Sequence, residues 1–188
     1  MNHLIKKYSS GNRILEIYRD EYPESPRDWD NLGTIVYYHE EYILGDEKME
    51  YEDMEDFIKT QFLAIPIYAY EHGQISIRAI PGNNPTYPFN DRWDSYFVGF
   101  ICLSKAKIIQ EYGSLDDLTP IVQNLINEVK TFNEYLNGNC YRYEIKEPHK
   151  CDLGENHYEL IDSNSGFIGD YEDMLKEWPE TKWTEIKE

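Results

Sequence analysis

The sequence predicts an α+β domain with a mainly antiparallel, twisted sheet, one long amphipathic helix and two or three short helices. Short segments alternate apolar and polar residues between turn residues, which is typical of strands. One segment near residues 115–137 instead repeats apolar residues at three- and four-residue steps, which is typical of a helix. Because hairpins are mixed with separate helices, the α+β arrangement is favoured.

In the first part of the chain, residues 13–18 and 34–38 are rich in β-branched and aromatic residues and predict two strands. The intervening residues 22–31 contain two prolines and predict a loop. A short helix is expected over residues 50–61.

The apolar run over residues 63–70 contains Pro66, so a bulge or an edge position in the sheet is expected there. Residues 75–79 alternate apolar and polar side chains, and the turn between the two runs contains His72 and Gly73. This pattern predicts a tight hairpin, with both residues tolerant of a positive φ. The proline-rich residues 81–92 predict the longest irregular loop.

Residues 96–103 are nearly all apolar and predict a strand buried on both faces. Ser104 can cap the helix that follows it, and Gly113 can end that helix. The long helix over residues 115–137 is expected to end at Asn137-Gly138.

Alternation over residues 141–145 predicts another strand, onto which residues 158–161 can pair back. We therefore expect a single α+β domain over residues 1–169. Residues 170–188 are expected to form an acidic helical tail without a fixed place on that domain.

The chain carries 36 Asp and Glu against 18 Lys and Arg, a formal net charge of −18 over 188 residues. A small soluble domain usually has a net charge of about 2–8 in magnitude. Direct contact with nucleic acid is disfavoured, because such binding depends on Lys and Arg neutralising phosphates. The partner that the charge favours is a basic protein surface, including one that normally holds nucleic acid.

No run of residues approaches the ~20 apolar residues that a membrane span needs, and the first residues lack the apolar segment of a signal peptide. The three cysteines, Cys102, Cys140 and Cys151, are too few and too scattered for a disulfide framework. These observations predict a cytoplasmic protein without membrane contact.

Two acidic regions are candidate contact surfaces. Residues 40–56 contain nine acids, of which helix capping accounts for two or three. A face that serves only solubility explains the others as well as a binding surface does. The candidate contacts of this first patch are Glu50, Glu52, Asp53, Glu55 and Asp56.

The second region lies near the C-terminus, with Asp170, Glu172, Asp173 and Trp178 as candidate contacts. Trp178 and Trp183 lie among acids, where exposed tryptophan is typical of a contact. The alternative is that both rings fold back onto the domain.

Catalytic and metal-binding patterns are weak. The spacing of Cys140, His149 and Cys151 matches no zinc pattern, and Cys102 in an apolar strand is expected to be inert, so no metal or cofactor is predicted. His39 and His72 are candidate bases, but no phosphate loop, dinucleotide fingerprint or hydrolase motif accompanies them.

Two Trp-Asp pairs leave an enzyme open as the alternative to a binding protein. Trp29-Asp30 and Trp93-Asp94 both stand where a loop meets a predicted strand, so the two carboxylates would share a site if the loops converge. In the structural alternative, each Asp caps backbone N–H groups and each Trp closes an end of the core.

Several segments together resemble an uncharacterised family of small acidic proteins encoded by bacteriophages and mobile elements of bacteria. They are residues 26–34 (Pro-Arg-Asp-Trp-Asp-Asn-Leu-Gly-Thr), 44–47, 65–68, 72–73, 93–95, 98–101, 111–113, 128–129, 135–138 and 162–169. Where the family looks like Trp-Asp-Ser-Gly-Gln-Val-Gly, this chain has Tyr96-Phe97 in place of Gly-Gln. The family supplies no functional residue, so the resemblance implies only a genomic context.

Small acidic proteins of that context often look like anti-restriction or anti-CRISPR factors, some of which mimic the charge of DNA. Charge and resemblance together favour a non-enzymatic inhibitor of a nucleic-acid-handling host defence protein. The alternatives are a small cytosolic enzyme with its site near Asp30 and Asp94, and an acidic phage accessory protein without an inhibitory role.

Overall fold

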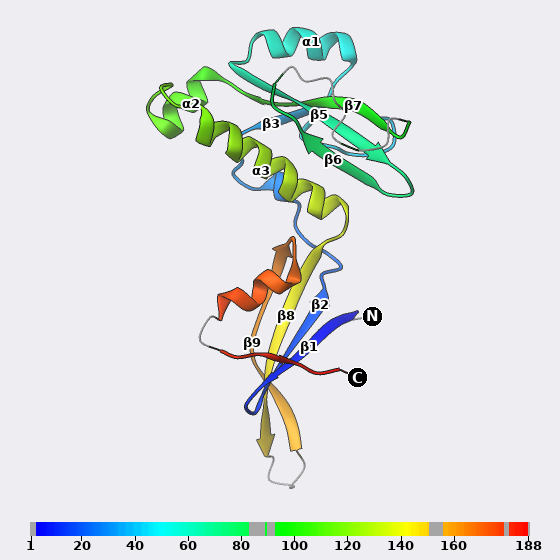
Figure 1. Cartoon of the computed structure of the whole chain (residues 1–188), viewed down its shortest axis with the longest axis vertical. Helices are drawn as coiled ribbons and strands as arrows, with labels where there is room; N and C mark the ends of the chain where they lie inside the picture. The colour runs from blue at the N-terminus through cyan, green and yellow to red at the C-terminus, as the bar shows by residue number, and fades with distance from the viewer. Residues whose placement is uncertain (1–2, 83–88, 90–92, 151–155, 179–180, 188) are drawn as a thin grey trace. The chain divides into compact units, whose positions relative to one another are not determined.

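The computed structural model describes residues 3–82, 89, 93–150, 156–178 and 181–187 (Figure 1). Its two antiparallel-rich sheets and separate helices confirm the predicted α+β class. The chain divides into a terminal unit, residues 1–24 with 138–188, and a central unit, residues 25–137. This division differs from the single domain expected over residues 1–169.

The terminal unit is built on a sheet in the order β10-β1-β2-β8-β9, in which all neighbours are antiparallel. Its strands are β1 (Leu4–Ser10), β2 (Arg13–Arg19), β8 (Cys140–Lys150), β9 (Asn156–Ile168) and β10 (Thr184–Glu185). The expected pairing of residues 158–161 back onto the preceding strand is confirmed by β8 and β9. Strand β1 was not expected from the sequence.

The last residues belong to this unit and do not form a free helical tail. Residues Tyr171–Glu177 form a 3-10 helix, η2, whose Met174 is 2% exposed and packs against the sheet. Strand β10 then pairs with β1, with Thr184 opposite Ser9. The expected tail is therefore corrected, because its apolar residues are used to cover the sheet.

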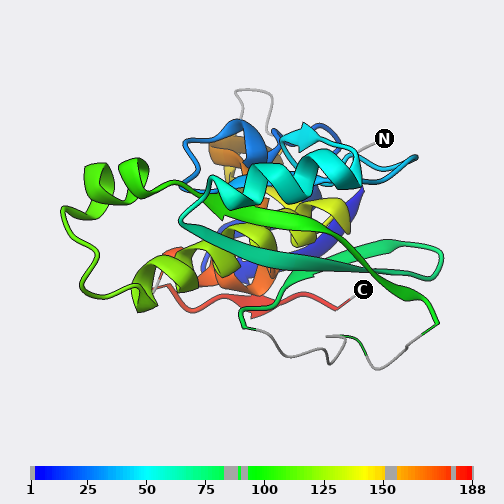
Figure 2. The same cartoon turned by 90° about the horizontal axis from the view of Figure 1, so that it is seen from above.

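The central unit is built on a sheet in the order β4-β3-β7-β5-β6, with β3–β4 parallel and the other pairs antiparallel. Its elements are η1 (Pro26–Asp28), β3 (Thr34–Tyr37), β4 (Glu47–Lys48), α1 (Tyr51–Lys59), β5 (Leu63–Glu71), β6 (Ile75–Ala79), β7 (Ser95–Leu103), α2 (Lys105–Tyr112) and α3 (Thr119–Leu136). Helix α1 lies on one face of this sheet and α3 on the other. Figure 2 shows α1 lying along β5 and β7.

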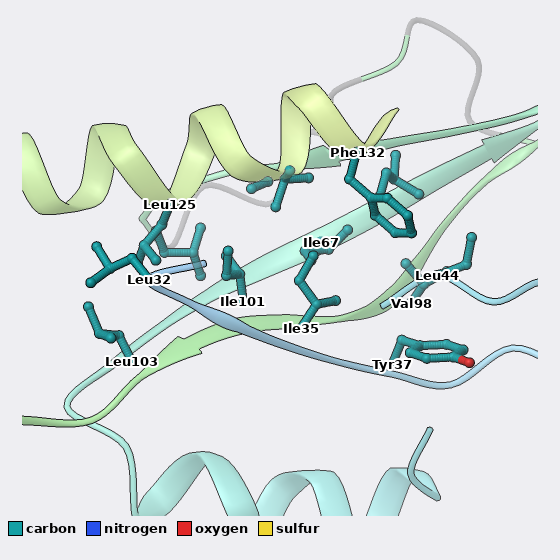
Figure 3. Packing of buried hydrophobic residues seen from close by; sticks show 14 of the residues in the cluster. Leu32, Ile35, Tyr37, Leu44, Ile67, Val98, Ile101, Leu103, Leu125 and Phe132 are labelled. Carbon is teal, nitrogen blue, oxygen red and sulfur yellow. The ribbon is translucent and has the colours of Figure 1, made fainter. Parts of the chain in front are cut away.

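The larger core fills the space between the sheet and α3. Ile35, Ile67 and Ile101 come from three neighbouring strands and face Leu125 and Phe132 of α3 (Figure 3). All five side chains are at most 3% exposed. Burying a side chain of this size contributes about 1.5–3 kcal/mol, so this layer fixes α3 on the sheet.

Pro66 lies in an interior strand and not at the expected edge. Strand β5 has β7 on one side and β6 on the other. Pairing with β6 begins only at Ile67, so the missing N–H of Pro66 interrupts no bond of that ladder. The register with β7 shifts between Ile67 and Tyr68, so the irregularity that the proline predicts lies immediately beyond it.

The helix cap, the helix end and the hairpin turn lie largely where the sequence predicts them. Ser104 Oγ accepts a hydrogen bond from Lys107 N, and α2 ends at Gly113 with a φ of 75°. The hairpin between β5 and β6 turns at Gly73, with a φ of 77°. His72 does not share this positive φ. Most of the loop expected over residues 81–92 lies outside the described residues.

Candidate functional site

The central unit contains a partly buried ionic network centred on Arg27, whose side chain is only 6% exposed. Its Nε and Nη2 donate to the two carboxylate oxygens of Asp46 at 2.9 and 2.6 Å, and its Nη1 donates to Glu128 Oε2 at 3.3 Å. Nη2 also donates to the Gly33 carbonyl at 2.7 Å. Burial alone would lower the pKa of this guanidinium, but the two carboxylates outweigh burial and raise it.

The two acids of the network also hold backbone groups. Glu128 accepts from Leu32 N at 2.6 Å and from Gly33 N at 3.1 Å, and Asp46 accepts from Ile35 N at 2.6 Å. The network therefore ties the start of β3 to α3 and to the loop before β4. A buried charge is stable only when it is paired and hydrogen-bonded in this way.

Two glycines allow the segments around Arg27 to approach one another closely. A Cβ atom on Gly33 would lie 2.6 Å from side-chain atoms of Ile101 and Leu125, and one on Gly45 would lie 2.3 Å from Ile35 Cγ2. Three of the separate segments quoted for the resemblance, residues 26–34, 44–47 and 128–129, therefore meet in one network. Packing and charge pairing explain those residues without a catalytic role.

A cavity of about 440 Å³ lies beside this network. It is lined by Trp29, Asp30, Asn31, Leu32, Lys107, Glu111, Tyr112, Asn124 and Glu128. Lys107 Nζ is already bound to the Asn31 carbonyl at 2.6 Å, and Glu128 to backbone amides. No Ser, Cys or His is among the described residues that line the cavity. Its composition suits a polar ligand better than nucleophilic catalysis.

The two Trp-Asp pairs do not converge on one site. Asp30 precedes β3, whose first residue, Thr34, lies opposite Cys102 near the end of β7. Asp94 directly precedes the first residue of the same nine-residue strand. At about 3.3 Å per residue, the two ends of β7 lie roughly 26 Å apart. Asp30 and Asp94 therefore do not share a site, and the alternative that expected one is wrong.

Asp94 instead lies 3.1 Å from His72, between Oδ2 and Nδ1, at the hairpin between β5 and β6. The His72 side chain is 76% exposed, so this pair lies at the surface. Trp93 is 95% exposed and does not close an end of the core.

A second histidine, His39, belongs to a hydrogen-bonded chain in the central unit. Its Nδ1 accepts from Glu41 N and Tyr42 N at 3.1 and 3.0 Å, which assigns the ring proton to Nε2. Nε2 then donates to Tyr96 Oη at 3.0 Å, and Tyr96 Oη donates to Glu71 Oε2 at 2.7 Å. Burial, followed by the bond to Glu71, raises the pKa of Tyr96.

The sequence singled out His39 as a candidate base but not its partners. The bonds show that both ring nitrogens are already used, one to hold the loop after β3 and one to reach Tyr96. The chain of bonds therefore fixes a loop on the sheet and shows no open position for a general base.

All five acids of the first predicted patch, Glu50, Glu52, Asp53, Glu55 and Asp56, are exposed on and just before α1. The opposite side of the helix is fixed, because Met54 is 1% exposed and packs with Val36 and Cys102 of the sheet. Of the five acids, Asp56 pairs with Lys59 at 2.7 Å. The remaining carboxylates form a rigidly supported negative surface.

The second predicted patch lies in the terminal unit and is partly used by its own structure. Asp170 Oδ1 accepts from Glu172 N and so caps η2, and Asp173 pairs with Lys176. Trp178 packs edge-on against Tyr143 at 4.8 Å between ring centroids.

Trp183 lies next to Trp178, with 6.1 Å between the ring centroids. Both rings pack against the core of the terminal unit. The fold-back alternative is therefore confirmed for both tryptophans, and each ring keeps a partly exposed surface.

The outer face of the terminal sheet carries a network of opposite charges around Glu16. Its carboxylate lies 2.6 Å from Lys146 Nζ and 2.9 Å from Lys7 Nζ, and it accepts from Tyr18 Oη at 2.8 Å. Burial would raise the pKa of Glu16, but the hydrogen bonds from Lys146, Lys7 and Tyr18 outweigh burial and lower it to about 2. This is a structural network, because both lysines and the tyrosine bind the one carboxylate of Glu16.

Replacing Glu16 with Gln is expected to lower the free energy of unfolding by about 1–3 kcal/mol at pH 7. Since the folded pKa is about 2 and the ordinary value is 4.5, the stabilisation from the charged form is complete above pH 4.5. It is then lost as the pH falls toward 2. Urea unfolding at pH 7, 4 and 2.5 measures this, and a difference that does not shrink toward low pH would contradict it.

The thiols are buried. Burial raises the pKa of Cys102 to about 12 and, as the main cause, that of Cys140 to about 11. Cys151 lies outside the described residues, and among those described no group of His, Cys, Asp and Glu side chains is arranged to hold a metal ion.

We expect Cys102 in the folded protein to react with a thiol reagent at pH 8 at least about a hundredfold more slowly than in denaturant. The reason is that the reactive thiolate is scarce and the sulfur is 2% exposed. Mass spectrometry of labelled peptides separates Cys102 from the other two thiols. Equal labelling rates before and after denaturation would show that the strand opens readily.

Across the described residues, no helix is long and apolar enough to cross a membrane. Comparison of the chain with models of known families, with curated proteins and with solved structures finds no match. A functional conclusion therefore depends on the surfaces and contacts described above.

Proposed function

We propose that this chain is a non-enzymatic binding protein whose acidic α1 surface contacts a basic surface of a nucleic-acid-handling host defence protein and inhibits it. This is the mode expected of an anti-restriction or anti-CRISPR factor of a phage or mobile element. The observation that carries the proposal is the exposure of all five acids at α1, on a helix whose other side is anchored by Met54.

A rigid helix is a favourable platform for such a contact. Charges on an exposed rim mainly speed encounter and select the partner, because a like-charged surface is repelled. Nucleic-acid-binding sites are basic for the same physical reason. The negative surface of α1 would therefore compete with phosphates for one basic groove.

We place a second contact at Asp170, Glu172 and Asp173 of the terminal unit. Its support is weaker, because Asp170 caps η2 and Asp173 pairs with Lys176. Glu172 is the member of this patch that is exposed without a side-chain hydrogen bond among the described residues.

The proposal is tested by immobilising the protein and passing nuclease-treated bacterial lysate over it at about 0.1 M and about 1 M salt. A nucleic-acid-handling protein should be retained at the lower salt, released at the higher, and lose its activity when the chain is added. In a gel shift the chain alone should not bind duplex DNA at physiological salt. Retention of no such protein beyond that on an equally acidic, unrelated protein would contradict the proposal.

A further inference from the structure

A narrow apolar groove of about 250 Å³ lies between α1 and β7 in the central unit. Phe97 and Phe100 line it from β7, and Met54 and Ile58 line it from α1. Tyr51, which is 46% exposed, lines it at the first turn of the helix. Pockets that enclose small-molecule ligands measure about 300–1,000 Å³, so this groove has the size for a single side chain.

The aromatic rings of the groove hold one another in fixed positions. Tyr51 and Phe97 have ring centroids 5.5 Å apart at an interplanar angle of 56°. Phe97 in turn meets Phe100 edge-on at 5.0 Å. Such contacts restrict the rings before any ligand arrives, which lowers the entropic cost of binding.

The charged residues that line the groove leave it negative. Glu55 lines it and makes no hydrogen bond or ion pair within the part of the chain that the structure describes. Lys59 also lines it, but its ammonium is bound by Asp56 at 2.7 Å. An apolar slot with aromatic walls therefore carries a carboxylate that has no ion pair of its own among the described residues. Asp56 is the main cause that raises the pKa of Lys59, and the charge of Glu55 adds to it.

We propose that the groove takes an arginine side chain presented by the basic partner. A guanidinium stacks on aromatic faces such as Tyr51 and pairs through two N–H groups with a carboxylate such as Glu55. The methylene groups of the same side chain match the apolar wall at Ile58. Lysine fits less well, because its compact, strongly hydrated ammonium does not stack in this way.

This inference rests on the proposed function for the identity of the partner, but it can be tested without that partner. The probes are two short peptides of equal charge, identical except that one has arginine where the other has lysine. Each is titrated into the ¹⁵N-labelled full chain and followed by NMR. The arginine peptide should bind several-fold more tightly, with shifts centred on Tyr51, Glu55 and Ile58.

Two surface variants localise the effect. Glu55→Gln should weaken binding of the arginine peptide about fivefold, and Tyr51→Leu should reduce its affinity to that of the lysine peptide. Glu24→Gln removes another exposed acid, in the terminal unit, and should leave the affinity unchanged. The comparison of peptides on the unaltered chain does not depend on either variant folding.

Equal affinity for the two peptides, or equal effects of Glu55→Gln and Glu24→Gln, would overturn the arginine groove and leave a diffuse charge effect. Its failure and that of the proposed function are distinguishable. A retained nucleic-acid-handling protein that ignores Tyr51→Leu and Glu55→Gln contradicts only the groove. An arginine-selective groove in a chain that retains no such protein contradicts only the proposed function.

Discussion

Replacing Arg27 with methionine is expected to lower the free energy of unfolding by about 3–5 kcal/mol. The substitution removes the cation that pairs with Asp46 and Glu128 while leaving both carboxylates in place. It also leaves the Gly33 carbonyl without its side-chain donor. The loss should be visible in urea unfolding at pH 7 as a lower midpoint. The stability of Arg27→Lys should lie between that of the unaltered protein and that of Arg27→Met, because lysine keeps the charge but not the bidentate hydrogen bond to Asp46.

The matched control is Lys59→Met, which removes the cation of the exposed pair with Asp56. These side chains are 70% and 80% exposed, so solvent screens the pair and the expected loss is far smaller than that of Arg27→Met. Equal effects of Arg27→Met and Lys59→Met would contradict the view that the Arg27 network holds the start of β3 on α3.

The elements that the sequence predicts well are those whose signals are local. Ser104 and Gly113 bound α2 because a hydroxyl acceptor and a residue tolerant of positive φ suffice at a helix start and end. The β5–β6 hairpin similarly depends on one turn residue, Gly73. Strand β1 has no comparable signal, since Lys6, Lys7 and two serines are weak strand formers. It forms because β2 and β10 supply its partners.

The division into two units depends on contacts between distant parts of the chain. Strand β2 pairs with β8, with Ile17 opposite Tyr143. In the sequence, the whole central unit lies between these two strands. Nothing in the local pattern of residues 13–18 identifies that partner. For the same reason, a short acidic helix was expected in the last segment, but not the sheet that Met174 and Trp178 cover.

The Arg27 network shows the same limit for a site. Arg27 lies 19 positions from Asp46 and 101 positions from Glu128, and each is an ordinary polar residue in its own segment. The segments that contain these three residues stand apart in the sequence. Only the structure shows that their side chains bind one another. By contrast, the acids at α1 were predicted correctly as exposed, because an amphipathic helix fixes which residues face the core.

Reversing the charge of Glu52, Asp53, Glu55 and Asp56 to lysine should abolish partner binding while nearly preserving the thermal midpoint. Against a basic groove, four like charges should weaken association by several kcal/mol. The effects on folding are small and of opposite sign. The reversal lowers the net negative charge, but it forfeits a dipole contribution of about 0.3–1 kcal/mol for each first-turn acid and the exposed pair with Lys59.

The control for this variant carries the same change in net charge at scattered, exposed acids outside residues 40–56 and the second patch: Glu24, Glu111, Asp116 and Glu159 to lysine. Retention and inhibition by both variants are measured at one salt concentration. If binding depends on the local surface of α1, the control retains the partner and the α1 variant does not. If both lose it equally, the net charge of the chain is what matters, and α1 is no more than part of a negative background. If the α1 variant still binds and inhibits like the unaltered protein, its acids serve only solubility, and the inhibitor proposal loses its main physical support.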